Sequence, residues 1–584
     1  MIKLITSNMK KKEWISLVLI VLFIVMQVWL DLKMPDYMNE ITVMLTGNSA
    51  TVKGVLVSGG YMLLCAIGSA LMSVLVGYFV SRLSAIVSMR VRAKVFNKVN
   101  SFSMNEISGF STASLLTRST NDVAHIQRFV AMGMQALIKA PILAVWAITK
   151  IATKNWQWTL ATGVVIFLII TLVMLLLKFV FPKFRQIQKI TDRLNSVTRE
   201  NLTGVRVVRA YNAEQYQEDK FQKANEDITK TNMFIHTFMS LMSPVMNLLM
   251  SGLGLAIYWI GAVLINGVGD FAQKQLLMGD MVVFSSYSMQ VIMAFMLLIS
   301  IFITYPRTAV AARRINEVLK TDSIIADGHR SSRSIKSTGE LEFRNVSFKY
   351  PDSNEYVLKN ISFKVGKGET IAFIGSTGCG KSTLINLIPR FYDVTDGEIL
   401  LNGVNVKDYK LKDLHNRIGY VSQRAVMFSG TVQSNITLGD YIAEPNTEDM
   451  IEAIEIAQAK DFVQSDKDLD KAIDQGGLNV SGGQKQRLSI ARAVLRKPEV
   501  CIFDDSFSAL DYKTDKKLRK ALQVKLQDTT CVIVAQRIGT IKNAHQIIVL
   551  EDGEIVGKGT HKQLLKTCEV YQEIALSQLD KEEL

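Results

Sequence analysis

A glycine-rich segment after a short apolar run carries the most specific chemistry in this sequence. Residues 370–374 predict a β-strand, and the residues after 383 predict a helix. Between them, glycine N–H groups can turn toward phosphate oxygens, Lys381 can neutralise phosphate charge and Ser382 can ligate magnesium. We therefore expect a P-loop that binds ATP with Mg²⁺. Its candidate residues are Gly375, Ser376, Thr377, Gly378, Cys379, Gly380, Lys381, Ser382 and Thr383.

Two further segments have chemistry that complements such a loop. The apolar run 500–503 ends in Asp504, whose carboxylate is a hard oxygen ligand, so we expect Ser382 and Asp504 to hold Mg²⁺. A second glycine-containing segment stands at the predicted start of a helix, where a hydroxyl and backbone N–H groups suit the γ-phosphate of ATP. Its members are Ser481, Gly482, Gly483 and Gln484.

With Val480 in front of it, this second segment resembles the Leu-Ser-Gly-Gly-Gln signature of the ABC transporter family. By that resemblance Tyr350 stacks on adenine, Gln423 senses magnesium and the attacking water, and residues 508–511 cross to another subunit. The signature of one chain would grip ATP held by the P-loop of the other. The resemblance implies an α-helical six-span transmembrane domain followed by an α/β P-loop nucleotide-binding domain, in the order typical of exporters.

Two positions depart from the family pattern at the predicted catalytic residues. The family glutamate after the magnesium aspartate is Asp505 here, and the missing methylene draws the carboxylate back by roughly 1.5 Å. The family histidine is Gln536, which cannot become cationic. With Gln423 as the third catalytic candidate, we expect this site to bind nucleotide but to hydrolyse it slowly. The chain thus resembles the degenerate-site subunit of heterodimeric bacterial multidrug exporters, with a slow but working homodimer as the alternative.

Apolar segments that could cross a bilayer, which need about 20 residues each, lie in the first half of the chain. Lys and Arg are more numerous in 1–12, 82–128 and 178–230 than in the alternate loops, which favours cytoplasmic termini. Lys139 is the one charged residue in the third span. Because a charge inside the membrane is costly, its presence there indicates a functional role such as substrate binding. The predicted spans are 15–30, 55–81, 129–148, 156–177, 239–264 and 281–305.

The same patterns divide the chain into domains. We expect a transmembrane domain at 1–320 with long cytoplasmic extensions, a serine-rich linker at 321–340 and a nucleotide-binding domain at 341–584. By resemblance, turns near 105–114 and 210–217 contact nucleotide domains. The net charge of +14 is explained by basic residues that face anionic lipid headgroups, so no nucleic-acid partner is expected. The five cysteines have neither metal-ligand nor disulfide spacing.

These features together predict ATP-driven export of amphipathic small molecules, drugs foremost, across the cytoplasmic membrane of a bacterium. The expected partners are a second ABC half-transporter chain, membrane lipids and the substrate. Export of lipids or peptides, a nucleotide-gated regulator that does not pump, and an importer stay open as alternatives. Methionines in the last two spans suit an adaptable apolar surface, although helix packing and lipid contact are the commoner explanation for them.

Overall fold

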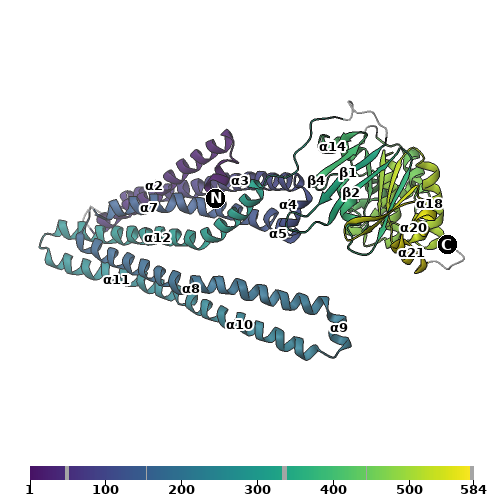
Figure 1. The fold of residues 1–584 in the computed structure, drawn as a ribbon. Coiled ribbons are helices and arrows are strands. Elements are labelled where there is room, and N and C mark those ends of the chain that lie inside the picture. Colours follow the sequence, from purple (N-terminus) through teal and green to yellow (C-terminus); the bar gives the residue numbers. More distant parts are fainter. Residues whose placement is uncertain (47–50, 153, 332–338, 442–443, 579–584) are drawn as a thin grey trace. The chain divides into compact units, whose positions relative to one another are not determined.

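The computed structural model describes residues 1–46, 51–152, 154–331, 339–441 and 444–578. The chain forms two compact units (Figure 1). One comprises Met1–Asn100 and Thr112–Thr321, and the other comprises Ser101–Ser111 and Asp322–Leu584. The short segment Ser101–Ser111 is therefore separated from its neighbours in sequence and belongs to the second unit.

The described part of the first unit is helical throughout. Six of its segments are long and apolar enough to cross a membrane, which confirms the predicted six-span organisation. Two of the six contain successive helices, because α5 to α7 run on from one another and α10 is followed directly by α11. The helices are α1 (Ile2–Thr6), α2 (Lys11–Thr46), α3 (Val52–Asn100), α5 (Thr112–Ser119), α6 (Asn121–Arg128), the π-helical turn η1 (Phe129–Gly133), α7 (Met134–Ala152), α8 (Trp156–Thr203), α9 (Val205–Ala210), α10 (Glu214–Ser240), α11 (Met242–Gly267) and α12 (Phe271–Lys320).

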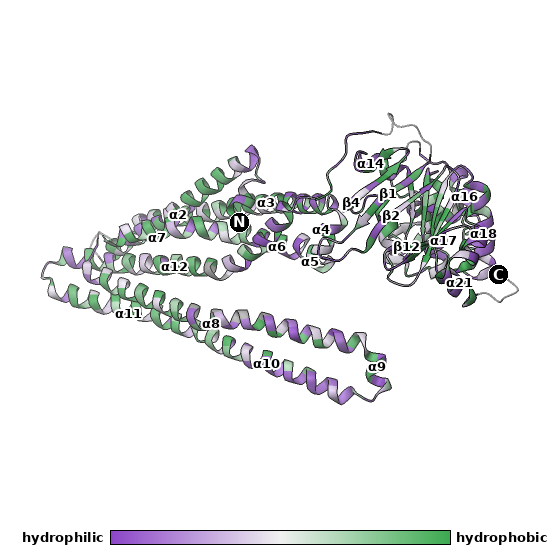
Figure 2. Ribbon diagram, in the orientation of Figure 1, coloured by the Kyte–Doolittle hydropathy of each residue, from purple (hydrophilic) through white to green (hydrophobic). Residues whose placement is uncertain are grey.

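Several of these helices are much longer than a bilayer requires. α3, α8 and α12 contain 49, 48 and 50 residues, whereas about 20 residues cross the hydrocarbon core. Helices α8 and α10 pair along their length and carry α9 at the end of the hairpin. Figure 2 shows hydrophobic residues in α11 and the adjoining part of α8, and hydrophilic residues toward α9. The transmembrane helices thus continue beyond their apolar parts, as the sequence predicts.

The second unit contains α4 (Met104–Gly109) and an α/β domain built on a six-stranded sheet of order β12-β11-β3-β10-β9-β6. All neighbours in this sheet pair in parallel except β12 and β11. The strands β3 and β9 are almost continuously apolar because both faces of a parallel sheet are covered. Their bounds are β3 (Thr370–Gly375), β6 (Ile418–Val421), β9 (Val500–Asp504), β10 (Thr530–Val534), β11 (Gln546–Glu551) and β12 (Glu554–Gly559).

A four-stranded antiparallel sheet of order β2-β1-β4-β5 packs against the first through a shared apolar core. Phe363 of this sheet contacts both Phe343 and Phe373, which belong to β1 and β3. The strands are β1 (Leu341–Phe348), β2 (Leu358–Val365), β4 (Asp396–Leu401) and β5 (Val404–Asn405), with a separate pair, β7 (Gly430–Thr431) and β8 (Ala472–Ile473). The helices are α13 (Lys381–Leu387), α14 (Leu411–Asn416), α15 (Val432–Ile436), α16 (Thr447–Ile456), α17 (Gly482–Leu495), α18 (Tyr512–Lys525), α19 (Ile538–Ile541), α20 (His561–Thr567) and α21 (Glu569–Leu576), with 3₁₀ turns at Asp466–Asp470 and Gln475–Gly477.

The segment expected to be a linker differs from that expectation in its first part. α12 ends at Lys320, and the chain then runs along the second unit. The amides of Gly328 and Arg330 donate to the carbonyls of Tyr409 and Asp408 at 3.1 and 2.8 Å. Gly328 permits this approach, since a Cβ there would lie 2.3 Å from the Tyr409 carbonyl oxygen. The serine-rich stretch 332–338 lies outside the described residues.

Candidate nucleotide-binding site

The glycine-rich loop has the backbone geometry that a phosphate cradle needs. Gly375 ends β3 and Gly380 precedes α13 at φ +96°, where a Cβ would lie 2.8 Å from Leu358. The exposed tip of the loop is formed by Ser376, Thr377 and Gly378, and Cys379 is buried behind it. Glycine is therefore required where the chain turns sharply into the helix.

Lys381 places its ammonium group inside this loop. Nζ donates to the carbonyls of Gly375 and Ser376 at 2.9 and 2.6 Å, and it lies 3.4 Å from Cys379 Sγ. The residue is only 9% exposed, so the aliphatic stem packs in the domain while the charge faces the loop. This arrangement concentrates positive charge where phosphate oxygens would bind.

The two predicted magnesium ligands meet at one edge of the sheet. Ser382 Oγ donates to Asp504 Oδ1 at 3.3 Å, although 122 residues separate them. They meet because β3 and β9 flank β10 in parallel, so the carboxyl ends of all three strands share an edge. Burial raises the pKa of Asp504, and the charge of Asp505 adds to the effect. A hydroxyl beside a buried carboxylate is a donor set that fits Mg²⁺.

The three predicted catalytic residues lie together, and two of them donate to the carboxylate of the third. Asp505 Oδ2 accepts from Gln423 Nε2 at 3.5 Å and from Gln536 Nε2 at 3.3 Å. They come from the chain segments after β6, β9 and β10. Asp505 has a left-handed backbone, φ +45°, and burial raises its pKa. The carboxylate thus lies between two neutral amides, and among the residues that the structure describes no histidine bonds to it.

A small aromatic cluster surrounds Tyr350. The hydroxyl groups of Tyr350 and Thr383 are 3.0 Å apart, which joins the aromatic residue to the end of the P-loop. Tyr392 meets the Tyr350 ring edge-on, with centroids 5.3 Å apart. Both tyrosines line a cavity of about 320 Å³. Sequence reasoning missed Tyr392, because it lies outside every motif and reaches Tyr350 only through folding.

The signature segment starts a helix, as its sequence predicts. Ser481 caps α17, and its hydroxyl accepts from the amide of Gln484 at 3.3 Å while Gln484 Oε1 accepts from the amide of Ser481 at 2.9 Å. Ser481 and Gly482 are exposed, and a Cβ on Gly482 would meet no atom within 4 Å. Within the described residues, no hydrogen bond joins this segment to the P-loop of the same chain.

Glu106 of α4 ties two distant chain segments together and was also missed. Its carboxylate accepts from the amide of Ser103 at 2.7 Å and from the amide of Ile324 at 3.1 Å. Burial by itself would raise the pKa of Glu106, but the bonds from Ser103 and Ile324 outweigh it and lower the pKa. The Ser-x-x-Glu spacing of a capping box was readable in the sequence. The bond from the amide of Ile324, 218 residues later, could not be predicted from the sequence.

Glu106→Ala should destabilise this junction by about 1 kcal/mol, because the part-buried amides of Ser103 and Ile324 lose their acceptor. Hydrogen exchange at the Ile324 amide would measure the loss. In the wild type this protection should be complete above the ordinary glutamate pKa, about 4.5, and should fall as pH drops through the lowered pKa of the folded state. Glu106→Gln keeps an oxygen acceptor and serves as the control, and equal protection in the alanine variant would contradict the assignment.

Known families match both units. Residues 17–295 match the family model described as ABC transporter transmembrane region, and residues 358–508 match the model described as ABC transporter. An Atm1-family ABC exporter of bacterial origin, solved with ATP bound, superposes with a TM-score of 0.80 over 98% of this chain and 99% of that one. At 20% identity this likeness concerns the fold.

Curated relatives align along most of their length. An uncharacterized ABC transporter ATP-binding protein of Mycobacterium bovis is 38% identical over 540 residues, 91% of this chain and 90% of that protein. The ATP-dependent lipid A-core flippase of Haemophilus influenzae is 32% identical over 505 residues, 85% and 84% of the two chains. With six spans, an ATP-binding domain and these relatives, the chain belongs to the ABC transporter family, as a half-transporter of the exporter type.

Proposed function

We propose that this chain exports amphipathic small molecules from a bacterial cytoplasm as one half of a heterodimeric ABC exporter, and that it supplies the weakly hydrolytic ATP site. The observation that carries the proposal is the environment of Asp505. Its shortened carboxylate is engaged by Gln423 and Gln536 at 3.5 and 3.3 Å, and neither amide can carry a proton to or from the reaction. Water activation needs a base placed to within about 1 Å, so this set favours nucleotide retention over turnover.

The nucleotide-binding residues follow the family pattern, whereas the catalytic residues depart from it. Lys381 and the loop glycines would hold the phosphates, and Tyr350 would stack on adenine. Ser382, Asp504 and the side-chain oxygen of Gln423 would hold Mg²⁺, which when bound neutralises phosphate charge. Ser481 to Gln484 would complete the competent site on the P-loop of a partner chain. One composite site then turns over while the other stays mostly occupied.

A partner chain is also favoured by the end of the α8–α10 hairpin. α9 has no buried residue, and the side chains of Val207, Tyr211 and Tyr216 are 61, 79 and 67% exposed. A cluster of large apolar side chains on a hydrophilic helix end is typical of a contact surface. We propose that this turn docks on the nucleotide domain of the second half-transporter, and that the turn around Asn105 serves the first nucleotide domain.

The membrane topology follows from the same proposal. Basic residues at 1–12 and in the proposed cytoplasmic extensions favour a cytoplasmic location for both termini and for the domain from about residue 341. Amphipathic drugs are the first substrate candidates. Lipids are the second, since the Haemophilus influenzae relative is named as a lipid A-core flippase.

Purification of this chain alone and together with the half-transporter encoded beside it tests the proposal. In lipid nanodiscs the lone chain should hydrolyse ATP weakly, and the pair should be faster by about tenfold or more, because only the pair contains a complete catalytic set. Strong turnover by the lone chain would favour the homodimer. Substrate flux that persists with a non-hydrolysable ATP analogue would favour a gated regulator instead.

A further inference from the structure

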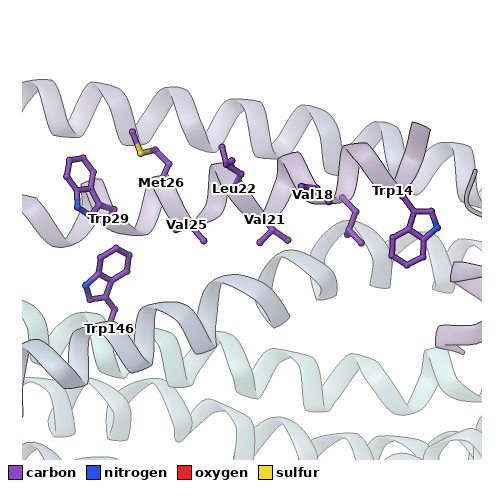
Figure 3. A pocket seen from close by; sticks show the side chains of 9 residues that line it. Trp14, Val18, Val21, Leu22, Val25, Met26, Trp29 and Trp146 are labelled. Atoms are coloured by element: carbon purple, nitrogen blue, oxygen red, sulfur yellow. The ribbon is translucent and has the colours of Figure 1, made fainter. Parts of the chain in front are cut away.

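The membrane unit presents an exposed apolar groove along α2, and its lining includes Val18, Leu22 and Trp29 of this helix and Trp146 of α7 (Figure 3). A helix that crosses the hydrocarbon core must present such side chains to lipid, which explains the groove without a ligand. A contact at the end of α21 has no explanation of this kind, because it joins a residue outside every motif to the predicted nucleotide site.

The side chain of Gln578 bridges two main-chain groups of the segment that carries Gln536. Its Oε1 accepts from the amide of Ile538 at 2.8 Å, and its Nε2 donates to the carbonyl of Gln536 at 2.7 Å. A glutamine amide has an acceptor at one end and donors at the other, so these two partners set its orientation. The bridge spans Arg537 and fixes the direction in which the main chain leaves Gln536.

The short helix α19 depends on this contact at its first residue. Arg537 occupies the cap position of α19 and makes no side-chain bond to the helix, so the amide of Ile538 takes its acceptor from another helix. α21 is held in place to supply it, because Tyr571 and Ala575 are fully buried in the apolar cluster that also contains Ile538. The place of Gln578 is therefore set by packing of the domain core.

The side chain of Gln536 connects the same segment to the nucleotide site. Its Nε2 donates to Asp505 Oδ2 at 3.3 Å, and Asp505 directly follows Asp504, which Ser382 of the P-loop contacts. The amide nitrogen of glutamine has two N–H groups, and the bond to Asp505 uses one of them. A glutamine side chain has several rotatable bonds, so a fixed main chain narrows the positions that the second N–H can reach.

We propose that Gln578 is a positioning residue of the weakly hydrolytic ATP site: it fixes the main chain on both sides of Arg537 and so aims the second N–H of Gln536 at the γ-phosphate. Gln536 then holds ATP by a bond that ADP cannot form. The inference rests on the proposed retention of nucleotide at this site and names a residue that secures it. Gln578 is exposed, and Arg519 of α18 anchors α19 through the carbonyl of Gly539, so substitution of Gln578 should leave the domain folded.

A photoreactive nucleotide measures retention on each chain separately. The assembled transporter in nanodiscs is loaded with azido-ATP or azido-ADP radiolabelled at the α-phosphate, chased with unlabelled ATP and irradiated at intervals, and its two chains are separated on a gel. Label on this chain reports the nucleotide beside its own Tyr350. Gln578→Met should release ATP about tenfold faster than wild type, the effect of one bond to a charged oxygen, and should release ADP at the wild-type rate.

A second glutamine on α21 provides a matched control. Gln572 Nε2 donates to the carbonyl of Leu565 in α20 at 2.7 Å, so Gln572→Met removes a similar bond and should change neither release rate. Gln578→Glu keeps an acceptor for the amide of Ile538 but loses the donor to the carbonyl of Gln536, and it should release ATP as fast as Gln578→Met. A wild-type rate in Gln578→Glu would mean that helix capping alone accounts for the contact, and the positioning role would be wrong.

Other results would also overturn the proposal. Unchanged ATP release in Gln578→Met would mean that Gln536 does not need the bridge, and equal acceleration of ATP and ADP release would indicate a general structural loss. Equal effects of Gln578→Met and Gln572→Met would assign the effect to docking of α21. Failure of the proposed function would look different, because a label at the γ-phosphate would then leave this chain of the unmodified transporter much faster than a label at the α-phosphate.

Discussion

Ser481→Arg in this chain should lower ATP turnover by the assembled transporter about 100-fold or more, because the long side chain would occupy the space in which the exposed helix start must approach the γ-phosphate on the partner, and the serine hydroxyl would be lost. The serine caps α17, and both Ser481 and Gly482 are exposed in this chain. Asp505→Asn should have a far smaller effect if, as proposed, Asp505 belongs to the weakly hydrolytic site. Steady-state ATPase assays on the two purified complexes compare these variants directly.

Ser481→Thr is the matched control for that experiment. Threonine keeps the helix cap and the hydroxyl, so turnover should stay near wild type, and the loss of a cap alone costs only about 1 kcal/mol. Thermal unfolding of the arginine variant separates a lost site from a lost fold. Equal losses from Ser481→Arg and Asp505→Asn would mean that both composite sites turn over, and the asymmetric assembly would be wrong.

Restoring the family residues should have the opposite effect at the site of this chain. Asp505→Glu with Gln536→His should raise hydrolysis there by up to about 100-fold, the penalty expected for a base misplaced by about 1 Å. The longer side chain carries its carboxylate past the point where Gln423 and Gln536 now meet Asp505. Histidine adds a group that titrates near pH 6.5, so the gain should depend on pH in that range.

Nucleotide trapping in a complex whose partner site has been disabled isolates this effect. Each single variant serves as a control. We expect the gain in hydrolysis of the double variant to exceed the product of the gains of the two single variants, because base and imidazole act on one phosphate. No gain in the double variant would mean that geometry outside these two positions limits hydrolysis. Rapid cleavage in the unmodified chain would contradict the degenerate-site proposal.

Local patterns predicted a large part of this molecule. The six spans are readable because a bilayer demands long apolar helices whatever their neighbours are. The P-loop is readable because strand, glycine turn and helix are contiguous, and Ser481 predicts a helix start for the same reason. Resemblance then supplied roles for residues such as Gln423 that no local pattern assigns.

Contacts between distant segments needed the folded chain. The order of strands β3, β10, β9 and β6 brings Ser382 to Asp504 and gathers Gln423 and Gln536 around Asp505. Helix packing decides that Lys139, readable as a costly charge, faces Asp31 on another span. A sequence determines which segments are apolar, helical or able to bind phosphate, because those properties depend on neighbours along the chain. Which side chains meet depends on strand order and helix packing, and these are set by the burial of whole surfaces at once.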